Sequence, residues 1–220
     1  MAQKRFAILA NSIKHYPARC IAGVEIDTVS AQPTVGRWVR PVSSIGEGEL
    51  PLQRTVLTGG IQPAVFDVVQ VECQHACNDA SQPENWLIVD GSPWIKTGTF
   101  NPILLPTLVE APVGLWDQPN MKTDRVTQDF IAAQPPQQSL YLINISQAVL
   151  SRTGHKHRLA FTYNGRHYDL SVTDPNAINY SRSASTLQLA NCYACISLAP
   201  PFLLGNGVHC HFKVVATLFA

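Results

Sequence analysis

The dipeptide Asn164-Gly165 constrains the fold of this chain more than any other feature. Both central positions of a type I′ hairpin turn need positive φ, which Asn and Gly adopt at low cost. A two-residue loop places Phe161 opposite Tyr168 and Leu159 opposite Leu170. Apolar and polar residues then alternate consistently on both strands, which fixes the register. The sequence therefore predicts a hairpin with Leu159, Phe161, Tyr168, Leu170 and Val172 on its core face and with Arg158, Thr162, His167, Asp169 and Ser171 on its other face.

Short apolar or β-branched runs favour strands elsewhere along the chain. We expect strands at 6–10, 20–26, 37–42, 66–71, 140–145, 193–198 and 210–218, and shorter ones at 85–89 and 94–96. Residues 43–60 and 176–188 are rich in turn-forming or polar residues and are predicted to be loops. On the last strand, alternation predicts that Cys210, Phe212, Val214, Ala216 and Leu218 share one face and that His209, His211, Lys213, Val215 and Thr217 share the other.

These patterns predict an all-β chain with two similar halves. Sixteen prolines in 220 residues argue against long helices. We expect a first small barrel over 1–78, an irregular connecting region over 79–137 and a second small barrel over 138–220.

The net charge of +1 hides an uneven distribution along the chain. Residues 1–60 carry seven Lys/Arg against four Asp/Glu, residues 61–137 three against nine, and residues 138–220 six against two, with five of the seven histidines. Two mildly basic ends are compatible with polyanion-facing modules, but they lack the strongly basic signature of a dedicated duplex binder.

The sequence shows neither a membrane span nor a signal peptide, and both bear on where the protein is located in the cell. No run of about 18 apolar residues predicts a membrane span, and the short apolar run near the N-terminus does not resemble a signal peptide. We therefore expect a cytoplasmic protein without membrane partners, whose six cysteines are reduced thiols.

Several motifs resemble one family along nearly the whole chain. They are ILANSIKH, CIAGVEI, GRWVRPVS, FDVVQVEC and PENWLI in the first half, and FTYNGRHYDLSVTDP, ACISLAPPF and HFKVVATLF in the second. In this order they resemble the dual OB-containing domain family, which comprises bacterial proteins of two tandem OB-like barrels. The resemblance implies two OB-like barrels and, by fold-level analogy, a nucleic-acid or nucleotide surface. The chain departs from the family pattern in its long 43–65 loop and its histidine-rich second half.

Trp38 and Arg40 share one strand face, with Arg37 on the other. An aromatic ring beside a guanidinium can stack a base and hold a phosphate, whereas the alternative places Trp38 in the core. Lys14 and His15 lie where an OB barrel has its first binding loop, or form an ordinary polar turn. The histidines and cations of the second half form a basic, pH-sensitive patch or a solvated sheet face. The predicted nucleic-acid-binding residues are Lys14, His15, Arg37, Trp38, Arg40, Arg158, Arg166, His167, His211 and Lys213.

Catalytic and metal-binding patterns are weak. Cys192 and Cys195 would point to opposite faces of a strand, and Cys73, His75 and Cys77 lack an obvious fourth ligand, so no metal site is predicted. The common nucleotide-binding and hydrolase motifs are absent, and we predict no catalytic residue and no cofactor.

Three functions remain open at this stage. The first is a non-enzymatic module that binds single-stranded nucleic acid or a nucleotide, within a larger complex. The second is a protein-interaction scaffold without nucleic-acid contact. The third is a hydrolase or transferase that uses a Cys–His pair.

Overall fold

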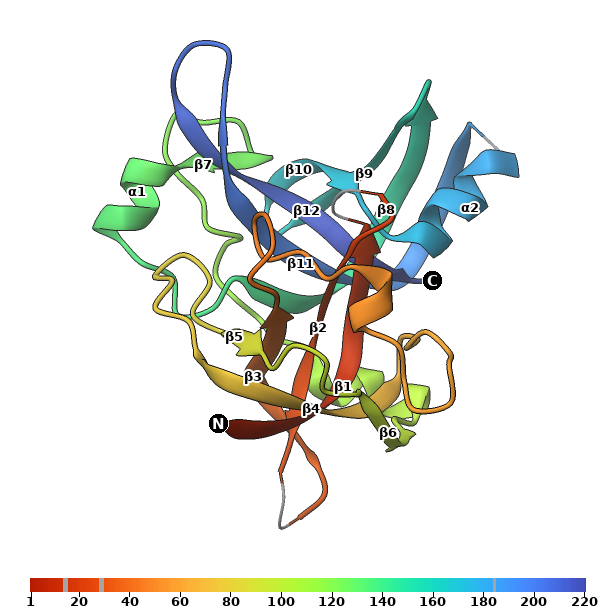
Figure 1. Cartoon of the computed structure of the whole chain (residues 1–220). Coiled ribbons are helices and arrows are strands. Elements are labelled where there is room, and N and C mark those ends of the chain that lie inside the picture. Colours follow the sequence, from red (N-terminus) through yellow and green to blue (C-terminus); the bar gives the residue numbers. More distant parts are fainter. Residues whose placement is uncertain (14–15, 28–29, 184) are drawn as a thin grey trace. The chain divides into compact units, whose positions relative to one another are not determined.

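The computed structural model describes residues 1–13, 16–27, 30–183 and 185–220 (Figure 1). The chain divides into two compact units. Residues 1–79 and 83–109 form the first, and residues 80–82 and 110–220 form the second. Strands make up 54% of the chain and helices 10%, which confirms the predicted all-β class.

In the described residues of the first unit the chain forms six strands and two short 3₁₀ helices. They are β1 (Ala2–Ile13), β2 (Arg19–Ile26), β3 (Pro33–Val42), η1 (Leu52–Arg54), β4 (Asp67–Ala76), β5 (Asn85–Ile88), β6 (Ile95–Thr99) and η2 (Pro102–Leu108). Five strands pair in the order β1-β2-β3-β5-β4, and β4 pairs back onto β1. β3 and β5 pair in parallel, while β6 extends the sheet from β4. The predicted OB-like barrel is therefore present in the first unit.

The first barrel closes because β1 is long and pairs with two strands. Phe6 lies opposite Glu25 on β2 and opposite Val69 on β4. The strands approach so closely at Gly23 that an added Cβ would lie 1.9 Å from the carbonyl oxygen of Ala7. Only glycine is accommodated there. The barrel core consists of Phe6, Ile8, Ile21, Val39, Leu50, Leu57, Val69, Val71, Cys73, Ile88 and Trp94.

The second unit repeats this arrangement of strands. Its elements are β7 (Arg125–Thr127), α1 (Gln128–Ala133), β8 (Leu140–Thr153), β9 (Lys156–Tyr163), β10 (Arg166–Val172), α2 (Pro175–Ser183), β11 (Thr186–Leu203) and β12 (His209–Phe219). The strands β8, β9, β10, β12 and β11 pair in the same order as β1, β2, β3, β5 and β4. The parallel contact between β10 and β12 is short, with only Ser171–Val214 and Val172–Val215 as pairs.

The predicted hairpin is confirmed in the second unit. Asn164 and Gly165 have φ values of 46° and 75°. Phe161 lies opposite Tyr168, and their rings stack with centroids 5.4 Å apart. All five residues predicted on the core face are buried.

Two details of the second unit differ from the sequence-based expectation. The segment 176–188 was predicted to be a loop, but it contains most of α2. Asp174 caps the start of this helix: the backbone N–H of Asn176 donates a hydrogen bond to Asp174 Oδ1 at 2.8 Å. Pro175 occupies the first helical position, which is a common place for proline at a helix start.

On β12 the predicted faces are wrong. The register against β11 shifts between Cys195 and Ile196, and Val215 and Leu218, which were predicted on opposite faces, belong to one core cluster. His211 and Lys213 are also buried, whereas Phe212 is partly exposed.

The predicted connecting region, 79–137, is divided between the two units. It supplies β5, β6 and η2 to the first unit, and residues 110–137 pack within the second. β5 has only four residues and pairs parallel with β3, so no hairpin signal marks it in the sequence.

Candidate functional site

Trp38 and Arg40 lie on β3 on either side of the core residue Val39 in the sequence, so strand alternation places them together on the side opposite Val39. Their side chains are nevertheless buried, with exposed fractions of 6% and 2%. Arg40 Nη2 lies 3.0 Å from Glu84 Oε1, and η2 packs against β3. This burial argues against a ligand-contacting role for either side chain. Lys14 and His15 lie outside the described residues.

Among the described members of the predicted set in the first unit, Arg37 is the exposed one. Its Nη2 lies 2.8 Å from Glu25 Oε2, and Lys4 Nζ lies 2.8 Å from Glu25 Oε1. The Lys4 ammonium also lies 4.0 Å from the ring centroid of Trp86. These contacts hold Arg37 in a structural ion-pair network, although 64% of its side chain remains exposed.

Lys213 is buried and paired with an acid from far along the chain. Its Nζ donates to Asp117 Oδ1 at 2.8 Å. Asp117 also accepts the Tyr168 hydroxyl at 2.5 Å, and Arg166 Nε lies 3.6 Å from it. We call these four residues the Asp117 cluster. It links β10 and β12, whose direct ladder has only two residue pairs, so its first role is structural.

The pKa values in the Asp117 cluster reflect burial and hydrogen bonding. Burial alone would raise the pKa of Asp117, but hydrogen bonds from Lys213 and Tyr168 outweigh it and hold the pKa below its ordinary value. Burial lowers the pKa of Lys213, against the opposing effect of Asp117. Burial also raises the pKa of the Tyr168 phenol. His211 is buried as well, with Nδ1 2.9 Å from the carbonyl oxygen of Ala199.

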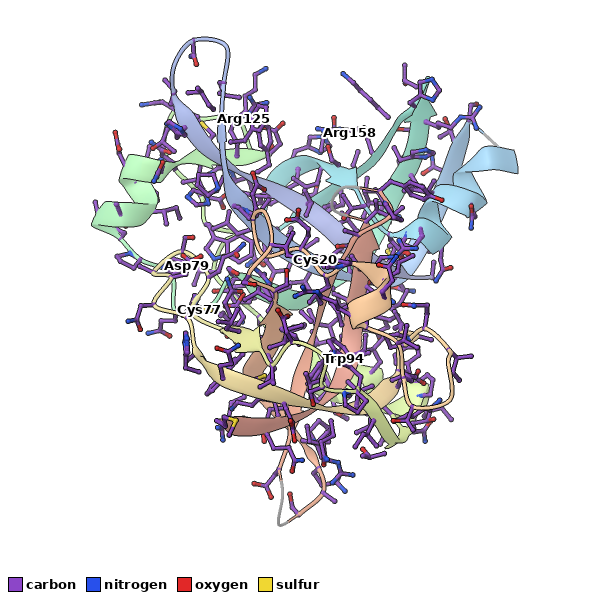
Figure 2. All side chains as sticks on the ribbon, viewed as in Figure 1. Cys20, Cys77, Asp79, Trp94, Arg125 and Arg158 are labelled. Carbon is purple, nitrogen blue, oxygen red and sulfur yellow. The ribbon has the colours of Figure 1, made fainter. Side chains whose placement is uncertain are left out.

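Arg158 and His167 lie on the outward face of β9 and β10, as predicted. Arg158 Nε lies 3.0 Å from Asp169 Oδ1, and its Nη1 donates to Ser171 Oγ at 2.9 Å. Asp124 lies 3.9 Å from Arg158 and 2.7 Å from Arg125. Figure 2 labels both arginines. Acidic neighbours therefore balance the charge of Arg158.

A hollow of about 490 Å³ opens on the same outward face. It extends over β8, β9, β10 and β11, and none of its described lining residues has a Lys, Arg, Asp or Glu side chain. Thr162 lies opposite His167, and Gln147 lies opposite Ala190. The lining combines polar residues, Ser146, Gln147, Thr162, His167 and Gln188, with apolar ones, Ala148, Val149, Ala160, Phe161, Leu189 and Ala190. Of these lining residues, only His167 was predicted as a site residue from the sequence. The others were missed because the alternation within a strand does not show which small residues of different strands lie next to each other.

Two hairpins extend from the second barrel toward the top of Figure 1. The β8–β9 turn exposes Arg152, His155 and Lys156. At the end of the β11–β12 hairpin, Phe202 is 60% exposed and lies edge-on to Phe212. The guanidinium of Arg125 lies 4.7 Å from the Phe212 ring centroid.

Three buried cysteines are poorly suited to nucleophilic chemistry. Burial raises the pKa of Cys73 to about 11 and also raises the pKa values of Cys192 and Cys210. Neutral thiols are poor nucleophiles. Within the described ranges, no group of three or more His, Cys, Asp or Glu residues could hold a metal ion. Nor does any helix in that part of the chain have the length and apolarity to cross a membrane.

Comparison with known proteins identifies a family for the chain. A search of curated proteins found no match. A family model described as the dual OB-containing domain matches residues 4–218. The chain therefore belongs to the dual OB-containing domain family.

Proposed function

We propose that the second unit binds single-stranded nucleic acid or a nucleotide on the outward face of β9 and β10, as a component of a larger complex. OB folds bind through the face of their second and third strands and through the loops that join strands 1–2 and 4–5. In the second unit these positions belong to β9 and β10, to the β8–β9 turn and to the β11–β12 hairpin. The observation that carries the proposal is that this face is open and hollowed.

The first unit supports the choice of the second as the binding unit. The strands that correspond to β9 and β10 are β2 and β3. On β3 the outward side chains of Trp38 and Arg40 are buried. A base or phosphate has no access to these side chains unless the structure changes.

The exposed groups of the second unit have complementary roles in this proposal. Arg152 and Lys156 on the β8–β9 turn meet phosphates, because their side chains are exposed cations. Phe202 offers an exposed ring on which a base can stack. Arg158 and Arg166 are held by Asp169 and Asp117, so they contribute less free charge.

A protein-interaction scaffold is the second candidate function. The observation that favours it is the exposed apolar group of Phe202, Leu203 and Val208 on the β11–β12 hairpin. Exposed apolar groups of this kind often contact other proteins. A stable protein complex together with no affinity for oligonucleotides would favour the scaffold.

Fluorescence anisotropy with labelled single strands across a salt series tests the nucleic-acid proposal. Replacing Arg152 and Lys156 together with Gln should reduce the salt slope by about 0.7 for each lost phosphate contact. Arg37→Gln is the matched control, since it removes an exposed cation from the first unit, and it should leave the slope unchanged. Absence of binding by the wild type at low salt would refute the proposal and favour the scaffold.

A further inference from the structure

We infer that the hollow over β8, β9, β10 and β11 is a subsite for one unpaired nucleobase. This inference rests on the proposed function and deepens it. It assigns the base to a neutral hollow and the phosphates to the β8–β9 turn. Base recognition and phosphate binding can therefore be tested with separate variants.

The first argument is the charge of the lining. A phosphate subsite needs cations, or several backbone N–H donors that converge on one point. Among the residues that the structure describes, no Lys, Arg, Asp or Glu side chain lines this hollow. Its polar lining groups are two amides, two hydroxyls and one imidazole, which offer both donors and acceptors. Such groups match the edge of an uncharged heterocycle, and Gln in particular can donate and accept on the same base.

The second argument is the shape and polarity of the floor. Val149 on β8 lies opposite Ala160 on β9, and Gln147 on β8 lies opposite Ala190 on β11. Small side chains at neighbouring positions leave a depression in the sheet. A planar base can bury a face against such apolar side chains while its edge meets the amides. His167 adds a ring that can stack on the base.

The third argument is size. A hollow of about 490 Å³ lies within the range of small-molecule sites. It can accept a base and its sugar, whereas a paired base would present its hydrogen-bonding edge to a partner strand. The hollow therefore selects single-stranded ligands.

The test variant fills the hollow with a larger apolar side chain and changes no charged residue. Ala190 is exposed on β11, so Ala190→Leu should fold normally and occupy the space that a base needs. The matched control is Ala132→Leu, an equal enlargement at an exposed position of α1 that does not line the hollow. Anisotropy would be measured with oligo(dA), oligo(dC), oligo(dG) and oligo(dT) at several salt concentrations, and thermal melts would check folding.

We expect the wild type to prefer one base by about tenfold. Ala190→Leu should abolish this preference and weaken binding about tenfold with an unchanged salt slope. The Arg152 and Lys156 variant should reduce the slope and keep the preference. If Ala190→Leu behaves like Ala132→Leu while single strands still bind, the base subsite is refuted and the proposed function stands.

Free nucleosides provide a second readout that does not depend on phosphate contacts. Titration of the four nucleosides should shift the NMR signals of Thr162 and His167 in the wild type and should leave them unshifted in Ala190→Leu. A lack of shifts in the wild type would overturn the subsite. A lack of oligonucleotide binding would by itself overturn the proposed function. The hollow could then not be the subsite for a base of a single strand.

Discussion

Replacing Asp117 with Asn should destabilise the protein far more than replacing Lys213 with Met. Lys213 is 1% exposed, and its ammonium is 2.8 Å from Asp117. The Asn variant leaves this cation buried without its counter-charge. Removing one partner of a buried ion pair costs about 3–5 kcal/mol.

The reciprocal change, Lys213→Met, should cost less stability. In Lys213→Met the stem is replaced by an apolar chain, and Asp117 keeps the Tyr168 hydroxyl and the nearby Arg166 guanidinium. Asp117 is also partly accessible to water. We expect a loss of about 1.5 kcal/mol or less, the upper range for a conservative core replacement.

Urea unfolding followed by circular dichroism measures both changes. With a slope near 2 kcal/mol per molar urea, a loss of about 3–5 kcal/mol lowers the midpoint by roughly 1.5–2.5 M. The double variant should be more stable than Asp117→Asn alone, because the buried charge is gone. Equal losses for both single variants, or a loss below about 1 kcal/mol for Asp117→Asn, would show that Lys213 is not a buried cation.

Three further predictions concern the core, acid stability and the thiols. Phe161→Ala should lower the free energy of unfolding by about 3–5 kcal/mol, and a loss below about 1 kcal/mol in urea titrations would mean that the hairpin face is wrong. Hydrogen bonds from Arg125 outweigh burial and hold the pKa of Asp124 below its ordinary value, so its stabilising effect is complete above pH of about 4 and is lost as pH falls through the lowered pKa. The difference in melting temperature between wild type and Asp124→Asn should therefore shrink as pH falls from 5 to 2, and a constant difference would contradict this. Denatured protein should give six free thiols, and at pH 8 the folded protein should react fastest at the partly exposed Cys20 and Cys77; rapid reaction of all six would contradict the burial of the others.

Local patterns predicted much of the fold. The Asn164-Gly165 turn and the alternation around it fixed both the register and the core face, because a two-residue loop leaves one arrangement. The β12 faces were predicted wrongly, because neither the register shift against β11 nor the pairing of Lys213 with Asp117, 96 residues earlier in the chain, leaves a signal in the local alternation. Alternation also placed Trp38 and Arg40 on one face. It carried no information on their exposure, which depends in part on the distant Glu84.

The candidate hollow shows why sites of this kind are hard to predict from sequence. It requires Gln147, Ala160, His167 and Gln188 to adjoin, and these residues come from four strands. Only the β9–β10 register was available from a turn signal. The pairing of β8 with β11 joins segments that no short motif connects.

Hydrogen–deuterium exchange with and without a single-stranded oligonucleotide tests most directly whether the second unit provides the binding face. We predict that the ligand slows amide exchange in β9, in β10 and in the β8–β9 turn, with exchange in β3 unchanged. Protection of β3 around Trp38 without protection of β9 and β10 would contradict this assignment.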